Sequence, residues 1–121
     1  MNCFKESMIG GENTAGFDYS LVDKAVKLIS ERMNPDLIII FGSVASRTAR
    51  QDSDIDMIVV MDTDAPYFWR NVPIHRLLRD SGIRVDRDII VLTPTEFRER
   101  LEDRTSFVHD VYSKGYVAYE A

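Results

Sequence analysis

Two aspartates separated by a single residue open an apolar segment of the chain, in the run Asp54-Ile55-Asp56-Met57-Ile58-Val59-Val60-Met61. On a β-strand, residues two apart point to the same face and lie roughly 6.5–7 Å from each other. Like charges at that spacing repel, and no basic residue lies between Gln51 and Asp64. Carboxylate oxygens are the ligands that Mg²⁺ prefers. The pair therefore predicts a magnesium site, and two ions about 3.5–4 Å apart would clamp the attacking and leaving oxygens of a phosphoryl displacement.

A glycine and a serine, Gly42 and Ser43, end the preceding apolar run, and ten residues separate them from Asp54. Glycine at the end of a buried strand lets the backbone approach a ligand closely. The amides that follow, near a helix N-terminus, point at an anion, and the Ser43 hydroxyl adds a donor. Arg47 and Arg50 lie in the connecting segment, where a guanidinium suits phosphate oxygens. We therefore expect these four residues to bind a polyphosphate beside the metal, an arrangement that belongs to nucleotidyl transfer.

A third carboxylate is expected from a later strand, over residues 83–92. Asp86 and Asp88 lie two apart on it and so share one face. Either residue can complete a metal site and accept the proton of an attacking hydroxyl. Arg84 and Arg87 support a second interpretation, in which the two acids form surface ion pairs worth about 0–1 kcal/mol.

Other conspicuous side chains have a structural interpretation. Tyr67, Phe68 and Trp69 are able to stack on a base, but we expect one of them to pack against the sheet. His75 and His109 have no cysteine or histidine at ligand spacing, which favours structural or surface roles.

The elements that position these residues follow from hydrophobic periodicity. An apolar stripe predicts a helix from Asp18 or Ser20 to Met33, stopped by Asn34-Pro35. The expected strands cover residues 37–41, 54–61, 83–92 and 116–119. The other expected helical segments are a short one within 44–53, one over 67–80 that is interrupted at Pro73, one that begins near Thr93, and one over 105–114. This order predicts an α/β (α+β) fold, with a small mixed, largely antiparallel sheet backed by helices on one side.

Composition limits the class of protein. The chain has 121 residues, 45% hydrophobic and 29% charged, which is the size and make-up of one globular domain. We expect residues 1–17 to be a flexible leader and residues 18–121 to be the domain. A net charge of −5 disfavours a dedicated nucleic-acid-binding module, and the longest apolar run, 37–41, is far shorter than a membrane span. The single cysteine, Cys3, fits a reducing cytosol, so a cytoplasmic protein is expected.

The motifs together resemble the minimal nucleotidyltransferases of the DNA polymerase β-like superfamily. The resemblance rests on Gly42-Ser43, Asp54-Ile55-Asp56, a later aspartate on a strand running into Thr93-Pro94, and the ending Gly115-Tyr116-Val117-Ala118-Tyr119-Glu120, which is similar to the family's G-x-x-x-Y-E close. It covers about residues 20–119 and implies the nucleotidyltransferase fold. The chain departs from the family's G-S-R-A-R-G by reading Val44-Ala45-Ser46-Arg47 after Gly42-Ser43.

The resemblance also implies roles for individual residues. Gly42 and Ser43 would bind the nucleotide phosphates, and Asp54 and Asp56 would bind Mg²⁺. The family usually places four apolar residues between the third aspartate and Thr-Pro. This spacing favours Asp88 as the third acid, with Asp86 as the alternative. Asp88 would then orient or deprotonate the acceptor.

The expected reaction is Mg²⁺-dependent transfer of a nucleoside monophosphate from an NTP, with ATP preferred, to a hydroxyl acceptor. Many relatives are antitoxin partners of small helical HEPN toxins, so the resemblance makes such a protein the leading acceptor. A second hypothesis is a binding module that neutralises a toxin by contact, with vestigial catalysis. A third, modification of a small molecule, needs an acceptor domain that a chain of this size has little room for. The sequence is compatible with both a homo-oligomer and a hetero-oligomer.

Overall fold

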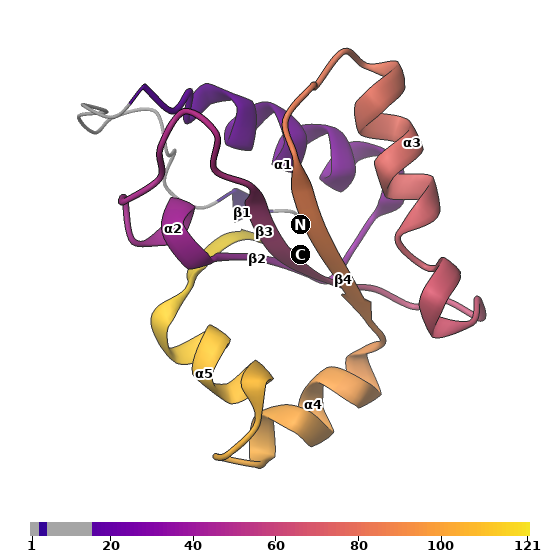
Figure 1. Ribbon diagram of the computed structural model, residues 1–121. Helices are drawn as coiled ribbons and strands as arrows, with labels where there is room; N and C mark the ends of the chain where they lie inside the picture. Colours follow the sequence, from indigo (N-terminus) through magenta and orange to yellow (C-terminus); the bar gives the residue numbers. More distant parts are fainter. Residues whose placement is uncertain (1–2, 5–15) are drawn as a thin grey trace.

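The computed structural model describes residues 3–4 and 16–121, and shows a five-stranded sheet in the order β1-β5-β2-β3-β4 (Figure 1). The elements are β1 Cys3–Phe4, α1 Ser20–Met33, β2 Leu37–Phe41, α2 Gly42–Ala45, β3 Ile55–Val60, the 3₁₀ turn η1 Tyr67–Trp69, α3 Val72–Asp80, β4 Arg87–Leu92, α4 Pro94–Glu102, α5 Phe107–Lys114 and β5 Tyr116–Glu120. The predicted fold class, a mixed α/β sheet with helices, is confirmed.

The expected leader is described only in part. Cys3–Phe4 pairs antiparallel with β5, and Phe17 is buried in the core. The rest of residues 1–15 lies outside the described residues, so flexibility there stays a prediction.

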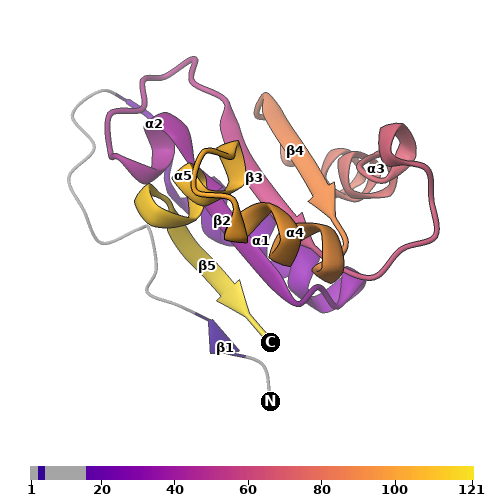
Figure 2. The same cartoon turned by 90° about the horizontal axis from the view of Figure 1, so that it is seen from below.

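The sheet is mixed, as predicted. β2 is antiparallel to both of its neighbours, β3 and β5, whereas the edge strand β4 runs parallel to β3. The parallel pairing is possible because α3 lies in the crossover between β3 and β4. Figure 2 shows the strands side by side, with α4 and α5 lying across one face.

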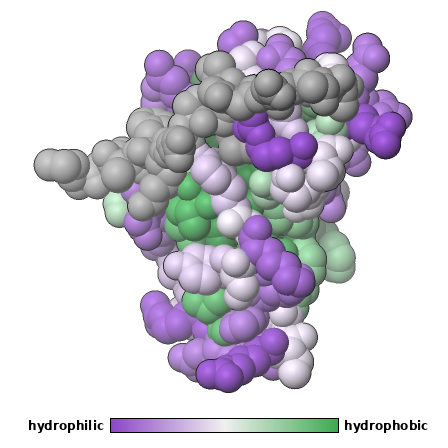
Figure 3. All heavy atoms as spheres, turned by 90° about the vertical axis from the view of Figure 1, so that its left-hand side faces the viewer, coloured by the Kyte–Doolittle hydropathy of each residue, from purple (hydrophilic) through white to green (hydrophobic). Residues whose placement is uncertain are grey.

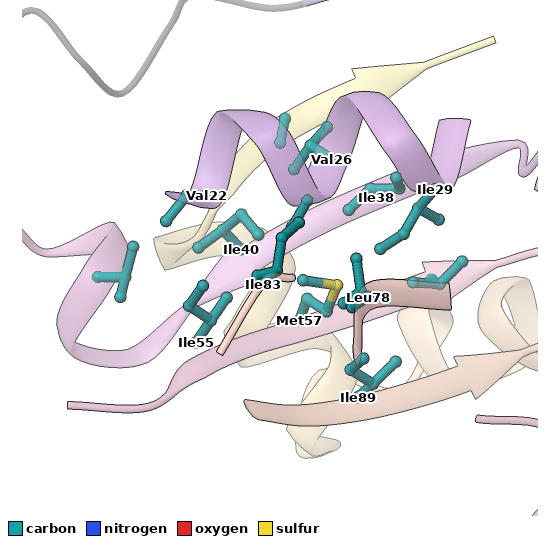
Figure 4. Close-up of a cluster of buried hydrophobic side chains, with 14 of the residues drawn as sticks. Val22, Val26, Ile29, Ile38, Ile40, Ile55, Met57, Leu78, Ile83 and Ile89 are labelled. Atoms are coloured by element: carbon teal, nitrogen blue, oxygen red, sulfur yellow. The ribbon is translucent and has the colours of Figure 1, made fainter. Parts of the chain in front are cut away.

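Helices cover both faces of the sheet, so the prediction of helices on one side was wrong. Alternate residues of the central strands serve two separate cores, because these strands are apolar on both faces. One core lies under α1 and α3 and includes Val26, Ile29 and Leu78 (Figure 4). The other lies under α4 and α5 and includes Ile39, Ile58 and Val111.

Local sequence signals fix the helix ends. α1 ends at Met33, and the next residue, Asn34, takes the left-handed conformation with φ 49°. α4 begins with a capping box, in which the Thr93 hydroxyl accepts from the Glu96 amide and the Glu96 carboxylate accepts from the Thr93 amide. Within residues 3–4 and 16–121, no helix is both long enough and apolar enough to cross a membrane.

Three details differ from the sequence-based expectations. The short helix expected within 44–53 begins earlier, at Gly42. β4 begins at Arg87 rather than at residue 83, so Asp86 precedes the strand. Tyr67, Phe68 and Trp69 are 46%, 84% and 65% exposed, so none of them packs into the core against the sheet.

Candidate active site

Asp56 and Asp88 lie side by side on neighbouring strands. They are directly paired in the parallel register of β3 and β4. Asp54 precedes β3 and shares their face of the sheet by its spacing from Asp56. Burial raises the pKa of the half-buried Asp56 carboxyl, and the charges of Asp88 and Asp54 raise it further. The structure therefore brings the Asp54 and Asp88 carboxylates close enough to Asp56 for their charges to disfavour its ionised form.

The Asp56 carboxylate is packed against Gly42. Gly42 follows Phe41, the register partner of Asp56, and has a left-handed backbone with φ 72°. A Cβ at this position would collide with Oδ2 of Asp56. Glycine is therefore required here for two reasons, the backbone conformation and the close approach of the carboxylate.

The segment after Gly42 is held by its own backbone. The carbonyl oxygen of Ser43 accepts a hydrogen bond of 2.9 Å from the Thr48 amide, which closes the turn after α2. The Arg47 guanidinium lies 4.2 Å from the centre of the Tyr19 ring, and Tyr19 belongs to the core under α1. Arg50 is exposed, in a turn that its amide closes on the Ser53 hydroxyl. The nucleotide-binding roles of Ser43, Arg47 and Arg50 stay predictions.

The start of β4 is braced by Arg87, whose role the sequence-based interpretation missed. Its guanidinium donates to the carbonyl oxygens of Ile83 (3.0 Å), Val85 (2.9 Å) and His75 (3.1 Å), and to Nδ1 of His75 (3.2 Å). These bonds join α3 and the 83–86 segment to the residue that directly precedes Asp88. Burial and the Arg87 charge lower the pKa of His75, which keeps the imidazole neutral and able to accept.

Asp86 belongs to this braced segment rather than to the strand. Its carbonyl oxygen accepts from the Ile55 amide at 2.9 Å, and its side chain is exposed. Asp88, in contrast, is on β4 and opposite Asp56.

The outer edge of β4 is closed by side chains from the segment before α3. Asn71 donates to the Ile89 carbonyl oxygen at 3.2 Å, and Arg70 donates to the Val91 carbonyl oxygen at 3.4 Å. A cavity of about 230 Å³ lies here, lined by Tyr67, Phe68, Asn71 and residues 88–91. The cavity therefore lies beside Asp88, one of the three predicted carboxylates.

The donor set fits a hard divalent cation, because it consists of carboxylate oxygens, and a cation would relieve the repulsion that Asp54 and Asp88 exert on Asp56. In the part of the chain that the structure describes, however, no three acidic, histidine or cysteine side chains form a ready-made metal centre. Asp54, Asp56 and Asp88 would therefore have to draw closer around an ion. Their assignment as ligands stays a prediction.

Comparison with protein families identifies the class. The model of the family "Polymerase beta, Nucleotidyltransferase" matches residues 23–120, which include all the predicted site residues. The chain therefore belongs to this nucleotidyltransferase family.

Two solved structures resemble the chain. One is described as a nucleotidyltransferase from Sulfolobus solfataricus, with 25% identity, a TM-score of 0.51, and coverage of 81% of this chain and 76% of the other. The other is a toxin–antitoxin with AMP-PNP, with 23% identity, a TM-score of 0.55, and coverage of 82% and 73%. At 23% identity, the similarity to the second structure shows a shared fold and nothing more. A comparison with curated proteins gives no match.

Proposed function

We propose that this protein transfers AMP from ATP, in an Mg²⁺-dependent reaction, to a hydroxyl group on a partner protein. The observation that carries the proposal is the register pairing of Asp56 with Asp88, beside Gly42 and in a chain of the nucleotidyltransferase family. A half-buried carboxyl such as Asp56, whose pKa is raised by burial and by two neighbouring aspartates, is typical of a site that works with bound cations.

Each site residue has a role in this proposal. Asp54, Asp56 and Asp88 would hold Mg²⁺, which supplies charge neutralisation for the phosphates and for the attacking and leaving oxygens. Gly42 leaves space for the Asp56 carboxylate and, with Ser43, would bind the phosphates. Asp88 would also orient the acceptor hydroxyl and accept its proton. Such catalysis depends mainly on positioning and electrostatic stabilisation.

The acceptor is proposed to come from a second protein. The described domain is filled by two cores around one sheet, and the cavity beside Asp88 is bordered by exposed aromatic side chains. Exposed aromatic residues are enriched at protein interfaces. The resemblance to minimal nucleotidyltransferases makes a small helical toxin of the HEPN type the proposed partner, and one solved neighbour is itself a toxin–antitoxin.

The experiment is intact mass spectrometry of the partner after co-expression with this chain. We expect one or more added AMP units with the wild-type chain, and none with the double variant Asp54→Asn plus Asp56→Asn. An unmodified partner in the presence of the wild-type chain would contradict the transferase proposal.

A second candidate function is neutralisation of the toxin by contact, with vestigial catalysis. The toxin–antitoxin neighbour favours it, because that likeness does not depend on catalysis. The same double variant separates the two functions in a toxicity assay. Full protection by the inactive variant supports the contact function, and loss of protection supports the transferase.

A further inference from the structure

We propose that the exposed aromatic turn η1, Tyr67–Trp69, is a docking surface that binds an arginine-bearing segment of a partner protein. All three rings are exposed, and none of them belongs to either core. The turn lies beside β4, just before α3 (Figure 1). Figure 3 views the other side of the molecule, where apolar surface lies between more polar regions. The inference rests on the proposed function, since the docked protein would be the acceptor of that reaction.

The aromatic turn is fastened to the outer edge of β4. Arg70 donates to the carbonyl oxygens of Ala65 at 3.0 Å and of Val91 at 3.4 Å. Asn71 donates to the carbonyl oxygen of Ile89 at 3.2 Å. Side chains that are held in place before binding lose little conformational entropy when a partner arrives. The exposed rings are therefore suited to anchor another protein.

The same hydrogen bonds restrict how a partner can bind. They occupy carbonyl oxygens of Ile89 and Val91, on the edge of β4 where an added strand would have to pair. Recognition must therefore come from the side chains of the turn. Tyr67 already has the Arg70 guanidinium 5.7 Å from its ring centre, whereas Phe68 is 84% exposed and offers open ring surface.

The charge around the turn favours a cationic partner. Asp62 and Asp64 are exposed in the loop that precedes it, and no lysine or arginine occurs between residues 51 and 69. Arg70, the next cation along the chain, is held in an ion pair, and its side chain is only 11% exposed. A guanidinium can stack on an aromatic ring and also pair with a carboxylate, so arginine fits this surface best. The two aspartates disfavour the phosphates of a nucleic acid.

A cavity connects the turn to the candidate active site. Tyr67 and Phe68 line the cavity of about 230 Å³ together with Asp88. A segment whose arginine stacks on Phe68 would therefore place its neighbouring residues beside Asp88. In the proposed function, Asp88 orients the acceptor hydroxyl, so the docking surface would bring the partner's hydroxyl to that carboxylate.

The test is an NMR titration of the ¹⁵N-labelled chain, without Mg²⁺ or ATP, with a synthetic peptide that carries one arginine on each side of a tyrosine. Matched peptides replace both arginines by lysine, by citrulline or by glutamate. We expect the amide signals of residues 62–71 and 88–91 to shift, together with the indole N–H signal of Trp69, the only tryptophan in the chain. The arginine peptide should bind most tightly and the lysine peptide about 3-fold more weakly, and the citrulline and glutamate peptides should give no saturable shifts.

One variant removes the stacking surface. Phe68→Ala should weaken binding of the arginine peptide about 5-fold, because it removes the most open ring of the turn. Tyr112→Ala is the matched control, since it removes an exposed aromatic ring from α5. It should bind the peptide as the wild type does.

A second variant removes the charge. Asp62→Asn plus Asp64→Asn should weaken binding of the arginine peptide about 3-fold at low salt and less at high salt, because exposed charges are screened. The control, Glu99→Gln plus Glu102→Gln, removes two exposed carboxylates from α4. It should leave the affinity close to that of the wild type.

Three results would overturn the proposal. They are wild-type affinity in Phe68→Ala, equal affinity for the arginine and glutamate peptides, and signal shifts that lie away from η1 and β4. A single-stranded RNA that binds the same residues more tightly than the peptide would assign the turn to nucleic acid instead. Failure of the proposed function gives a different result: the arginine peptide binds with the expected Phe68 dependence, but no AMP reaches any partner.

Discussion

Asp56 and Asp88 face each other across the only parallel pairing among the described strands, and each of them is the second residue of its strand. Parallel neighbouring strands begin at the same edge of a sheet, so both carboxylates stand at one end of it. The Gly42 turn stands there too, because β2 is antiparallel to β3 and ends where β3 begins. The candidate site is therefore a direct consequence of strand order and direction.

Replacement of Asp56 by asparagine is expected to stabilise the metal-free protein at neutral pH. The pKa of Asp56 is raised in the folded state, mainly by burial. The folded state therefore binds a proton more tightly than the unfolded chain, and stability falls as pH rises from the ordinary aspartate value through the raised one. Asp56→Asn removes this loss, so its gain in melting temperature over wild type should be larger at pH 7 than at pH 3.5.

Thermal melts in EDTA at both pH values measure this difference. A gain that is the same at both pH values would contradict it. Addition of Mg²⁺ should stabilise the wild-type chain more than the variant, because ligands that bind only the folded state raise its stability.

Replacement of Gly42 by alanine is expected to cost more than the same change at Gly82. Both glycines have positive φ, 72° and 81°, so alanine is strained at either position by about 1 kcal/mol. At Gly82 nothing lies within 4 Å of the added Cβ, whereas at Gly42 it meets the Asp56 carboxylate. We expect Gly82→Ala to lower the free energy of unfolding by about 1 kcal/mol and to leave nucleotide binding intact.

Gly42→Ala should lower the free energy of unfolding by about 2–3 kcal/mol and abolish AMP transfer. Urea unfolding and nucleotide titration of the two variants provide the comparison. Equal losses of stability with normal transfer in both would show that the contact between Gly42 and Asp56 is not required.

Removal of the Arg87 guanidinium is expected to weaken the site and the fold together. Arg87 makes four hydrogen bonds that join α3 and the segment before β4. Arg87→Ala should lower the free energy of unfolding by about 2 kcal/mol, since bonds from a charged group to part-buried acceptors are lost. Arg84→Ala is the control, because Arg84 is exposed in the same segment, and it should change stability by less than about 0.5 kcal/mol.

Urea unfolding and initial rates of AMP transfer check this expectation. The transfer rate should fall in Arg87→Ala and not in Arg84→Ala, because Asp88 directly follows Arg87. A normal rate of AMP transfer in both variants would show that the hydrogen bonds of Arg87 have a structural role only.

The sequence predicted what depends on local periodicity and turn chemistry. The two-sided apolar run at 37–41 correctly indicated an interior strand, and the Thr93–Glu96 box correctly indicated the start of a helix. The family resemblance, carried by Gly42-Ser43 and the aspartate pair, is confirmed by the family match.

Contacts between residues that are far apart in the chain could not be predicted from the sequence. The strand expected from residue 83 begins only at Arg87, and the Arg87 side chain donates to the carbonyl oxygens of Ile83 and Val85 in the segment before it. No local pattern shows where a guanidinium will donate. The placement of α4 and α5 on the second face also depends on tertiary packing, although the two-sided apolar strands gave a signal for it.

The last prediction concerns the choice between Asp86 and Asp88 as the third acid. Asp88 lies in register with Asp56, and its charge raises the pKa of that residue, whereas Asp86 precedes the strand. Asp88→Asn should therefore reduce the rate of AMP transfer by at least 100-fold, because the acceptor loses the group that orients it and accepts its proton. Nucleotide binding should fall much less, since Asp54 and Asp56 stay in place. Asp86→Asn should keep most of the rate, because the contact that Asp86 makes with Ile55 uses its backbone carbonyl. Initial rates and ATP titrations on both variants measure these effects, and the reverse order of rates would identify Asp86 as the third acid.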